Sequence, residues 1–153
     1  MKEKVQWPKM FISILLPFTV GMLGNLLSGD SMHVYAAIAK PDFAPPGWVF
    51  PVVWSILYLC MGIAAYRGWT HGASMKFYYL QLFFNFLWPI IFFRYQYFLL
   101  AFFDLLLVAV FIIGTMLRFA EKDVWSAVLL IPYLLWVVYA GVLNYAIFLL
   151  NCF

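Results

Sequence analysis

Three apolar segments of the chain place tryptophan or tyrosine about one helical turn from an amide or a small side chain. If each segment is a helix, three sets of residues each share one face: Gln81, Asn85 and Trp88; Trp54, Tyr58 and Met61; and Trp136, Ala140 and Asn144. Aromatic faces bind a flat apolar molecule by stacking, and amides orient it by hydrogen bonds. Residues that share a helical face in this way also serve packing and hydrogen bonding between membrane helices. The spacing therefore leaves two interpretations open, a ligand pocket and contacts between helices.

Asp104, in a further apolar segment, is the only acidic or basic residue in the interior of any long apolar segment of the chain. An acid near the centre of a membrane helix costs about 2.5 to 3.5 kcal/mol on insertion scales. We therefore expect Asp104 to face inward, where tryptophan, tyrosine or asparagine side chains could donate to it. Two roles are compatible with that position: a structural hydrogen-bond acceptor, and a part in proton or ion movement.

The remaining reactive side chains are too scattered for the common catalytic and metal sites. His33 and His71 lie in separate predicted loops, so we expect no metal site. Cys60 and Cys152 form no C-x-x-C pair and are interpreted as small packing residues. Lysine and arginine occur singly, which argues against a nucleic-acid partner, and no Gly-rich phosphate loop is present.

The composition identifies the solvent that surrounds these segments. Of the 153 residues, 67% are apolar, 22% are aromatic and only 10% are charged, and the mean hydropathy is +0.98. A water-soluble domain has roughly a quarter of its residues charged. The chain is therefore expected to be a single integral membrane domain over residues 1–153, in contact with the lipid bilayer.

Five apolar segments have the length of a membrane helix, which is roughly 17 to 25 residues. They cover residues 8–27, 46–66, 76–94, 97–118 and 124–150. Backbone groups must be paired within the bilayer, so helices are expected, and the short connections favour antiparallel neighbours. The predicted fold class is all-α: a bundle of five transmembrane helices with a long first loop.

The basic residues predict the orientation of this bundle. Seven lie on the side of the N-terminus and two on the opposite side: Lys2, Lys4, Lys9, Arg67, Lys76, Arg118 and Lys122 against Lys40 and Arg94. Cytoplasmic loops are enriched in lysine and arginine. The N-terminus is thus predicted to be cytoplasmic, with the first loop and the C-terminus facing outward.

The end of the first loop combines three prolines with two aromatic residues before the second predicted span. Pro45, Pro46 and Trp48 belong to this segment, KPDFAPPGW, over residues 40–48. Proline restricts the backbone, so the segment is expected to be stiff. It is either a simple entry into the helix or a lid that caps a pocket among the helices.

Four ordered stretches, which together extend over most of the chain, resemble the TspO/MBR family, known in animals as the translocator protein or peripheral-type benzodiazepine receptor. The stretches are KPDFAPPGWVFPVVWSILYLCMGIAAY (40–66), QLFFNFLWPIIFF (81–93), DLLLV (104–108) and IPYLLWVVYAGVLN (131–144). The short termini are similar to those of bacterial members. Animal members carry a basic residue shortly after the position of Tyr145 for sterol recognition, whereas AIFLLNCF follows here.

The resemblance implies a five-helix bundle whose first loop covers a pocket for porphyrins such as protoporphyrin IX or haem, with no cofactor required. By this resemblance, Trp54 and Trp136 match tryptophans associated with porphyrin binding and light-driven porphyrin breakdown. The other implied ligand-binding residues are Pro45, Pro46, Trp48, Tyr58, Asn85, Trp88 and Ala140. Trp54 and Trp136 are expected to face each other across the bundle.

Several functions are consistent with such a pocket. The first is a sensor, scavenger or regulator of tetrapyrroles; the alternatives are a transporter of hydrophobic ligands, a light-dependent porphyrin-degrading enzyme and a regulatory partner subunit. A bound tetrapyrrole would keep its propionates near the interface, where Lys40 or Arg94 could meet them. Association into a homodimer through the membrane helices is also expected.

Overall fold

The computed structural model describes residues 4–152, which fold into a bundle of helices. The helices are α1 (Trp7–Ser28), α2 (Ser31–Ala37), α3 (Val49–Thr70), α4 (Lys76–Pro89), the π-helical turn η1 (Ile90–Arg94), α5 (Phe98–Ala120), α6 (Val124–Val128) and α7 (Ile131–Asn151). Helix α1 packs on α3 and α4, and α5 packs between α4 and α7. The all-α membrane bundle that the sequence predicted is therefore confirmed.

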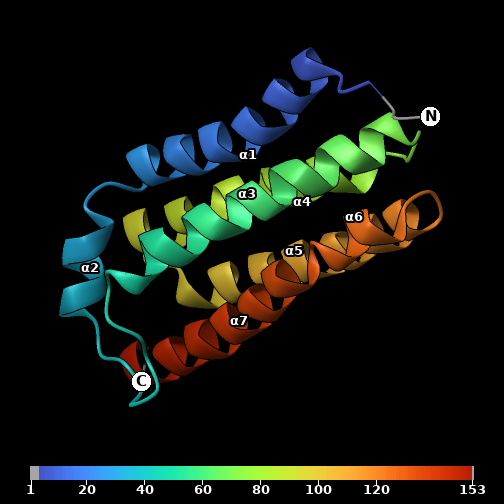
Figure 1. The fold of residues 1–153 in the computed structure, drawn as a ribbon. Coiled ribbons are helices and arrows are strands. Elements are labelled where there is room, and N and C mark those ends of the chain that lie inside the picture. The colour runs from blue at the N-terminus through green and yellow to red at the C-terminus, as the bar shows by residue number, and fades with distance from the viewer. Residues whose placement is uncertain (1–3, 153) are drawn as a thin grey trace.

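Figure 1 shows the long helices side by side, with the N-terminus at one end of the bundle and α2 and the C-terminus at the other. Four helical stretches within residues 4–152 are long and apolar enough to cross a membrane: α1, α3, α5, and the stretch Val124–Asn151 that joins α6 to α7. Helix α4 and the turn η1 follow each other without a break over residues 76–94.

Short polar residues and prolines determine where several helices begin and change. The Asp30 carboxylate accepts a hydrogen bond from the His33 backbone amide at 3.1 Å and starts α2, a helix within the first loop that the sequence reasoning did not predict. Pro89 has no N–H to donate, and the α-helix changes to a π-turn at the next residue.

Two of the predicted spans, 46–66 and 124–150, differ clearly from the helices of the structure. The first of these begins at Val49 rather than at residue 46, and it extends to Thr70 rather than ending at residue 66. The predicted span 124–150 is divided into α6 and α7, because α7 restarts with Pro132 in its first turn.

The basic residues collect at the two ends of the bundle. Arg67 at the end of α3 forms a bidentate ion pair with Asp123, the N-cap of α6, at 2.7 and 2.8 Å. At this same end the Lys9 ammonium lies 5.1 Å from the centre of the Trp69 ring. Lys40 and Arg94 lie at the opposite end; Lys2, counted with the N-terminal set, is outside the described residues. This division agrees with the grouping used to predict orientation.

Candidate functional site

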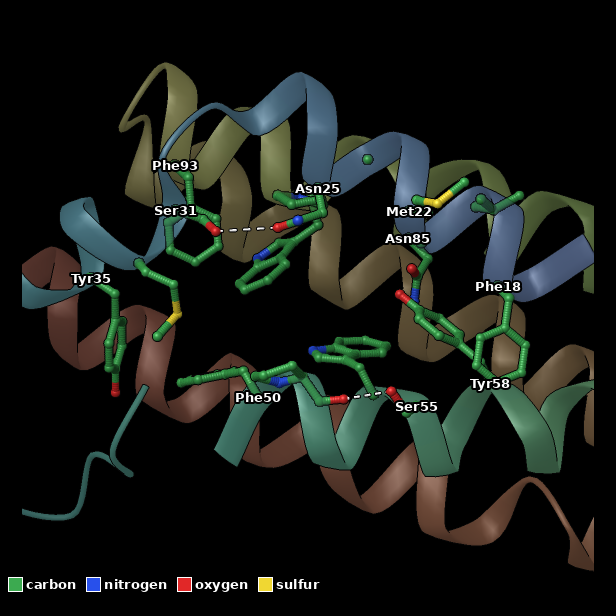
Figure 2. A pocket seen from close by; sticks show the side chains of 18 of the residues that line it. Phe18, Met22, Asn25, Ser31, Tyr35, Phe50, Ser55, Tyr58, Asn85 and Phe93 are labelled. Carbon is green, nitrogen blue, oxygen red and sulfur yellow. Dashed lines mark hydrogen bonds between the residues drawn. The ribbon is translucent and has the colours of Figure 1, made fainter. Parts of the chain in front are cut away.

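A cavity of about 420 Å³ lies between α1, α3 and α4, in the halves of these helices that are nearest to α2. Helix α2 lies over it. Figure 2 shows aromatic and polar side chains converging on it from these helices. Its lining includes four of the residues singled out from the sequence: Trp54, Tyr58, Asn85 and Trp88. Its volume falls within the range of roughly 300 to 1,000 Å³ that is usual for small-molecule sites.

Aromatic rings form much of the wall that α3 contributes. The Trp54 ring stacks on Tyr58 with centroids 5.4 Å apart, and its edge meets Tyr133 of α7 at 6.1 Å. Phe18 of α1 closes on Tyr58 from the other side at 5.7 Å. These rings hold one another in place, so a planar ligand would meet a surface that is already arranged.

A buried chain of hydrogen bonds fixes the amide of Asn85. Its Nδ2 donates to the Tyr133 hydroxyl at 2.8 Å, and that hydroxyl donates to Gln81 Oε1 at 2.6 Å. Gln81 and Tyr133 are almost completely buried between α4 and α7. The sequence reasoning missed Tyr133, although it precedes Ala140 and Asn144 by two and three helical turns on the same face of one helix.

Trp88 is fixed in a similar way from the opposite side. Its indole Nε1 donates to Asn144 Oδ1 at 3.1 Å, and Asn144 Nδ2 donates to the Phe98 carbonyl at 2.7 Å. Both interpretations of the residues that share a helical face, ligand binding and hydrogen bonding between helices, therefore apply to part of the set. Gln81 and Asn144 join helices, whereas Asn85 and Trp88 join helices and also line the cavity.

Trp136 and Ala140 lie behind this wall rather than in it. Trp136 is not among the described residues that line the cavity; its ring contacts Phe50 at 5.9 Å and Tyr139 at 5.3 Å. The two indoles contact different rings, and of the two only Trp54 lines the cavity. Ala140 borders a separate hollow of about 10 Å³ that shares Trp88 with the main cavity.

The first loop and α2 form a roof over this end of the bundle. The Tyr35 hydroxyl donates to the Pro45 carbonyl at 2.7 Å, and burial raises the pKa of Tyr35 to about 12. Pro46 and Trp48 are exposed, Trp48 by 65%, and neither they nor Pro45 line the cavity within the described part of the chain. Their place is in the entry to α3.

Hydrogen bonds from α7 hold the roof down. Asn151 and Ala39 exchange two of them, at 3.0 and 2.9 Å, and the Tyr139 hydroxyl donates to the Phe43 carbonyl at 2.9 Å. The loop part of the roof is thus attached to α7 by these bonds, as well as to α2 by the Tyr35–Pro45 bond. The segment 40–48 itself leads into α3 and none of its residues lines the cavity, whereas α2 covers the cavity through Met32 and Tyr35.

The cations expected to meet propionates are engaged elsewhere. The Lys40 ammonium donates to the carbonyls of Tyr35, Ala36 and Ile38 at 2.6 to 3.3 Å, and Arg94 donates to the Leu27 carbonyl at 3.2 Å. Neither residue lines the cavity, and every lining residue in the described range is neutral. The geometry therefore suits the uncharged body of a ligand and gives no support to the expected carboxylate contacts.

Asp104 faces the interior of the bundle, as expected, with 5% of its surface exposed. The neighbouring Leu105 lines the cavity. Within residues 4–152, however, the Asp104 Oδ2 atom has no hydrogen-bond partner, and the predicted tryptophan, tyrosine or asparagine donors do not reach it. The structure thus places the acid next to the cavity wall without a donor for this oxygen.

Comparison with known proteins agrees with this arrangement. Residues 13–150 match the model of the TspO/MBR family. The chain is 36% identical over 149 residues to the tryptophan-rich protein TspO of Archaeoglobus fulgidus, covering 94% of this chain and 97% of that protein. It is 38% identical over 148 residues to the protein of the same name from Chlorobaculum tepidum, covering 92% and 94%.

Similarity extends to an animal protein, the translocator protein of Bos taurus, with 35% identity over 140 residues, 86% of this chain and 83% of that one. The apolar helices described above make the chain a multi-pass membrane protein whose surface contacts lipid. On the family match and these relatives, the chain belongs to the TspO/MBR family.

Proposed function

We propose that this protein binds porphyrins or similar flat tetrapyrroles in the cavity between α1, α3 and α4, and acts as a sensor or scavenger of these molecules. The observation that carries the proposal is the stacked Trp54–Tyr58 wall beside the fixed amide of Asn85, in a neutral cavity of about 420 Å³. Ring faces supply contact area for a planar molecule, and the amide offers a polar group for its pyrrole nitrogens.

We also propose that the bundle crosses the membrane five times, with α4 and η1 acting together as one crossing. They cover residues 76–94, and at about 1.5 Å per residue this length approaches that of a hydrocarbon core. Five crossings place the two groups of basic residues on opposite sides. The larger group and the N-terminus are then cytoplasmic, and the roof faces outward.

The test of binding is a titration of the purified protein with protoporphyrin IX in darkness, followed by absorption and fluorescence. The variant Trp54→Ala removes a ring from the wall and should weaken binding at least tenfold, which corresponds to about 1.4 kcal/mol. Trp125→Ala is the matched control, because Trp125 is 66% exposed and lies on α6 away from the cavity. Equal affinity in both variants would remove the cavity as the binding site.

Repeating the titration under illumination tests the enzymatic alternative. Binding without loss of the porphyrin spectrum supports a sensor or scavenger. Loss of the spectrum with time, dependent on Trp54, would instead support light-driven porphyrin breakdown. The position of Trp54 on the cavity wall, and of Trp136 away from it, makes Trp54 the residue to test first.

A further inference from the structure

The cavity opens sideways between α1 and α3, toward the region that lipid occupies. Several of its lining residues are also exposed on the outer surface of the bundle: Met22, Asn25, Met32, Pro51 and Ser55. They come only from α1, α2 and α3, whereas the lining residues from α4 and α5, such as Asn85, Trp88 and Leu105, are buried. The first three helices therefore form a rim, and α4 and α5 form the floor.

This opening exists because α1 leaves α3 as it approaches the roof. Near the other end the two backbones touch, since a Cβ at Gly62 of α3 would lie 2.7 Å from Ile14 Cα. Further along, α1 rests on α4 instead, where a Cβ at Gly24 would lie 3.2 Å from the Phe86 carbonyl oxygen. The cavity is lined by both helices in this region, by Phe18 and Met22 from α1 and by Ser55 and Tyr58 from α3 (Figure 2).

The opening lies within the membrane-spanning part of both helices. Met22 lies six residues before the end of α1, and Ser55 lies six residues after the start of α3. At 1.5 Å per residue both are about 9 Å inside their helices. Asn25, Ser31 and Ser55 place polar atoms around the rim, on a surface otherwise apolar.

The route from the aqueous phase into the cavity leads through the roof, which several hydrogen bonds hold in place. The roof is held by the Asn151–Ala39 pair, the Tyr139–Phe43 bond and the Tyr35–Pro45 bond, all between 2.7 and 3.0 Å. Entry through the roof would require several of these bonds to break together. At the opening between α1 and α3, by contrast, the rim carries the exposed side chains of Met22 and Met32.

We propose that the ligand enters and leaves the cavity through this opening, from the leaflet beneath the roof, and that Ser55 and Met22 line the portal. The inference rests on the proposed function for the identity of the ligand. It adds that the exchange partner of the site is the bilayer rather than the aqueous phase. A tetrapyrrole with a large apolar body concentrates in lipid and would reach the site along the membrane.

The kinetic test uses protoporphyrin IX and protein in lipid nanodiscs. Ser55→Phe should narrow the portal and slow both association and dissociation, each about threefold or more. Val110→Phe is the matched control, on the exposed face of α5 away from the cavity. Asn151→Ala loosens the roof and should leave both rates unchanged. A faster rate in Asn151→Ala, with no change in Ser55→Phe, would overturn the portal.

A second measurement needs no porphyrin. Phe93→Cys places a thiol on the cavity wall, in a background in which Cys60 and Cys152 are replaced by alanine and serine. A pyrene maleimide, which partitions into lipid, should label it, and Ser55→Phe should slow this labelling about threefold. A sulfonated maleimide should not label it. Labelling by the sulfonated reagent that Ser55→Phe does not affect would overturn the portal.

The two tests separate the two proposals. If protoporphyrin does not bind but pyrene maleimide labelling depends on Ser55, the portal stands and the ligand assignment fails. If protoporphyrin binds and neither its rates nor the labelling respond to Ser55→Phe, the ligand assignment stands and the portal fails.

Discussion

The hydroxyl of Tyr133 joins the side-chain amides of Gln81 and Asn85, which lie one turn apart on α4. It accepts from Asn85 and donates to Gln81, both buried. Removing it would leave two buried amides without this partner, and an unpaired buried polar group costs about 1 to 3 kcal/mol. At the cavity, the Asn85 side chain would then lose the hydrogen bond that fixes its orientation.

Tyr133→Phe is therefore expected to lower the free energy of unfolding by about 1 to 3 kcal/mol and to weaken porphyrin binding. Thermal unfolding and a dark titration measure the two effects. Tyr79→Phe is the control, since Tyr79 is exposed on α4 and its ring faces away from the cavity lining. Unchanged stability in Tyr133→Phe would show that the hydrogen-bond chain is not needed to hold Asn85.

The two tryptophans differ in position, so their phenylalanine variants should differ too. Trp54→Phe keeps a ring on the cavity wall and should weaken affinity by about 0.5 to 1.5 kcal/mol. Trp136→Phe should change affinity less, because Trp136 contacts Phe50 and Tyr139 rather than the cavity. Under illumination, any porphyrin decay should fall in parallel with affinity. A decay rate that falls far more than affinity in Trp54→Phe would assign chemistry to that indole.

At the scale of elements, the pair Arg67–Asp123 joins the end of α3 to the start of α6. Arg67 lowers the pKa of the Asp123 carboxyl by hydrogen bonding and by its charge. A carboxyl whose pKa is lower in the folded state stabilises the fold above its unfolded pKa, near 4, and loses this contribution as pH falls through the folded value. The contribution is modest, because the Arg67 side chain is 36% exposed.

Asp123→Asn should accordingly reduce stability by about 0.5 to 1 kcal/mol at pH 7, while its side-chain oxygen still caps α6. The difference between the wild type and the variant should shrink as the pH falls below 4, which thermal unfolding in detergent at pH 7 and pH 3 would measure. Glu121→Gln is the control, since the Glu121–Arg118 pair is exposed on both sides. A difference that grows at low pH would contradict the assignment.

The sequence predicted the elements better than their ends. Long apolar runs predict helices because a helix pairs its backbone groups within its own segment, as lipid requires. Their ends depend on local chemistry that hydropathy does not measure. Asp30 starts α2 inside an apparent loop, and Pro89 changes the helix type after α4. The identity of the cavity wall was partly predictable as well, since Trp54, Tyr58, Asn85 and Trp88 follow helical spacing.

Trp136 and Lys40 were predicted at the cavity and lie away from it because of their tertiary contacts. Trp136 shares a helical face with Ala140, but Phe50 occupies the space next to its ring. Lys40 has the charge to meet a carboxylate, but its ammonium donates hydrogen bonds to the Tyr35 and Ile38 carbonyls at the end of α2 instead. Spacing along one helix does not reveal which neighbour covers a side chain.

At the scale of the whole molecule, the grouping of the basic residues predicts orientation. In intact cells, a membrane-impermeant maleimide should label His33→Cys in the roof and should not label Glu121→Cys at the other end, in a background without Cys60 and Cys152. Both positions are exposed in the structure. Labelling of Glu121→Cys alone would reverse the proposed topology.

The roof is attached through contacts that are very distant in the sequence. Asn151 and Ala39 are 112 residues apart, and Tyr139 and Phe43 are 96 apart. During synthesis, these pairs can form only after α7 has left the ribosome and entered the bilayer. The helices that line the cavity are made earlier, since α1 to α5 precede α7 in the chain. The newly inserted chain therefore passes through a stage in which the cover of its cavity is unfastened, and the arrival of α7 fastens it.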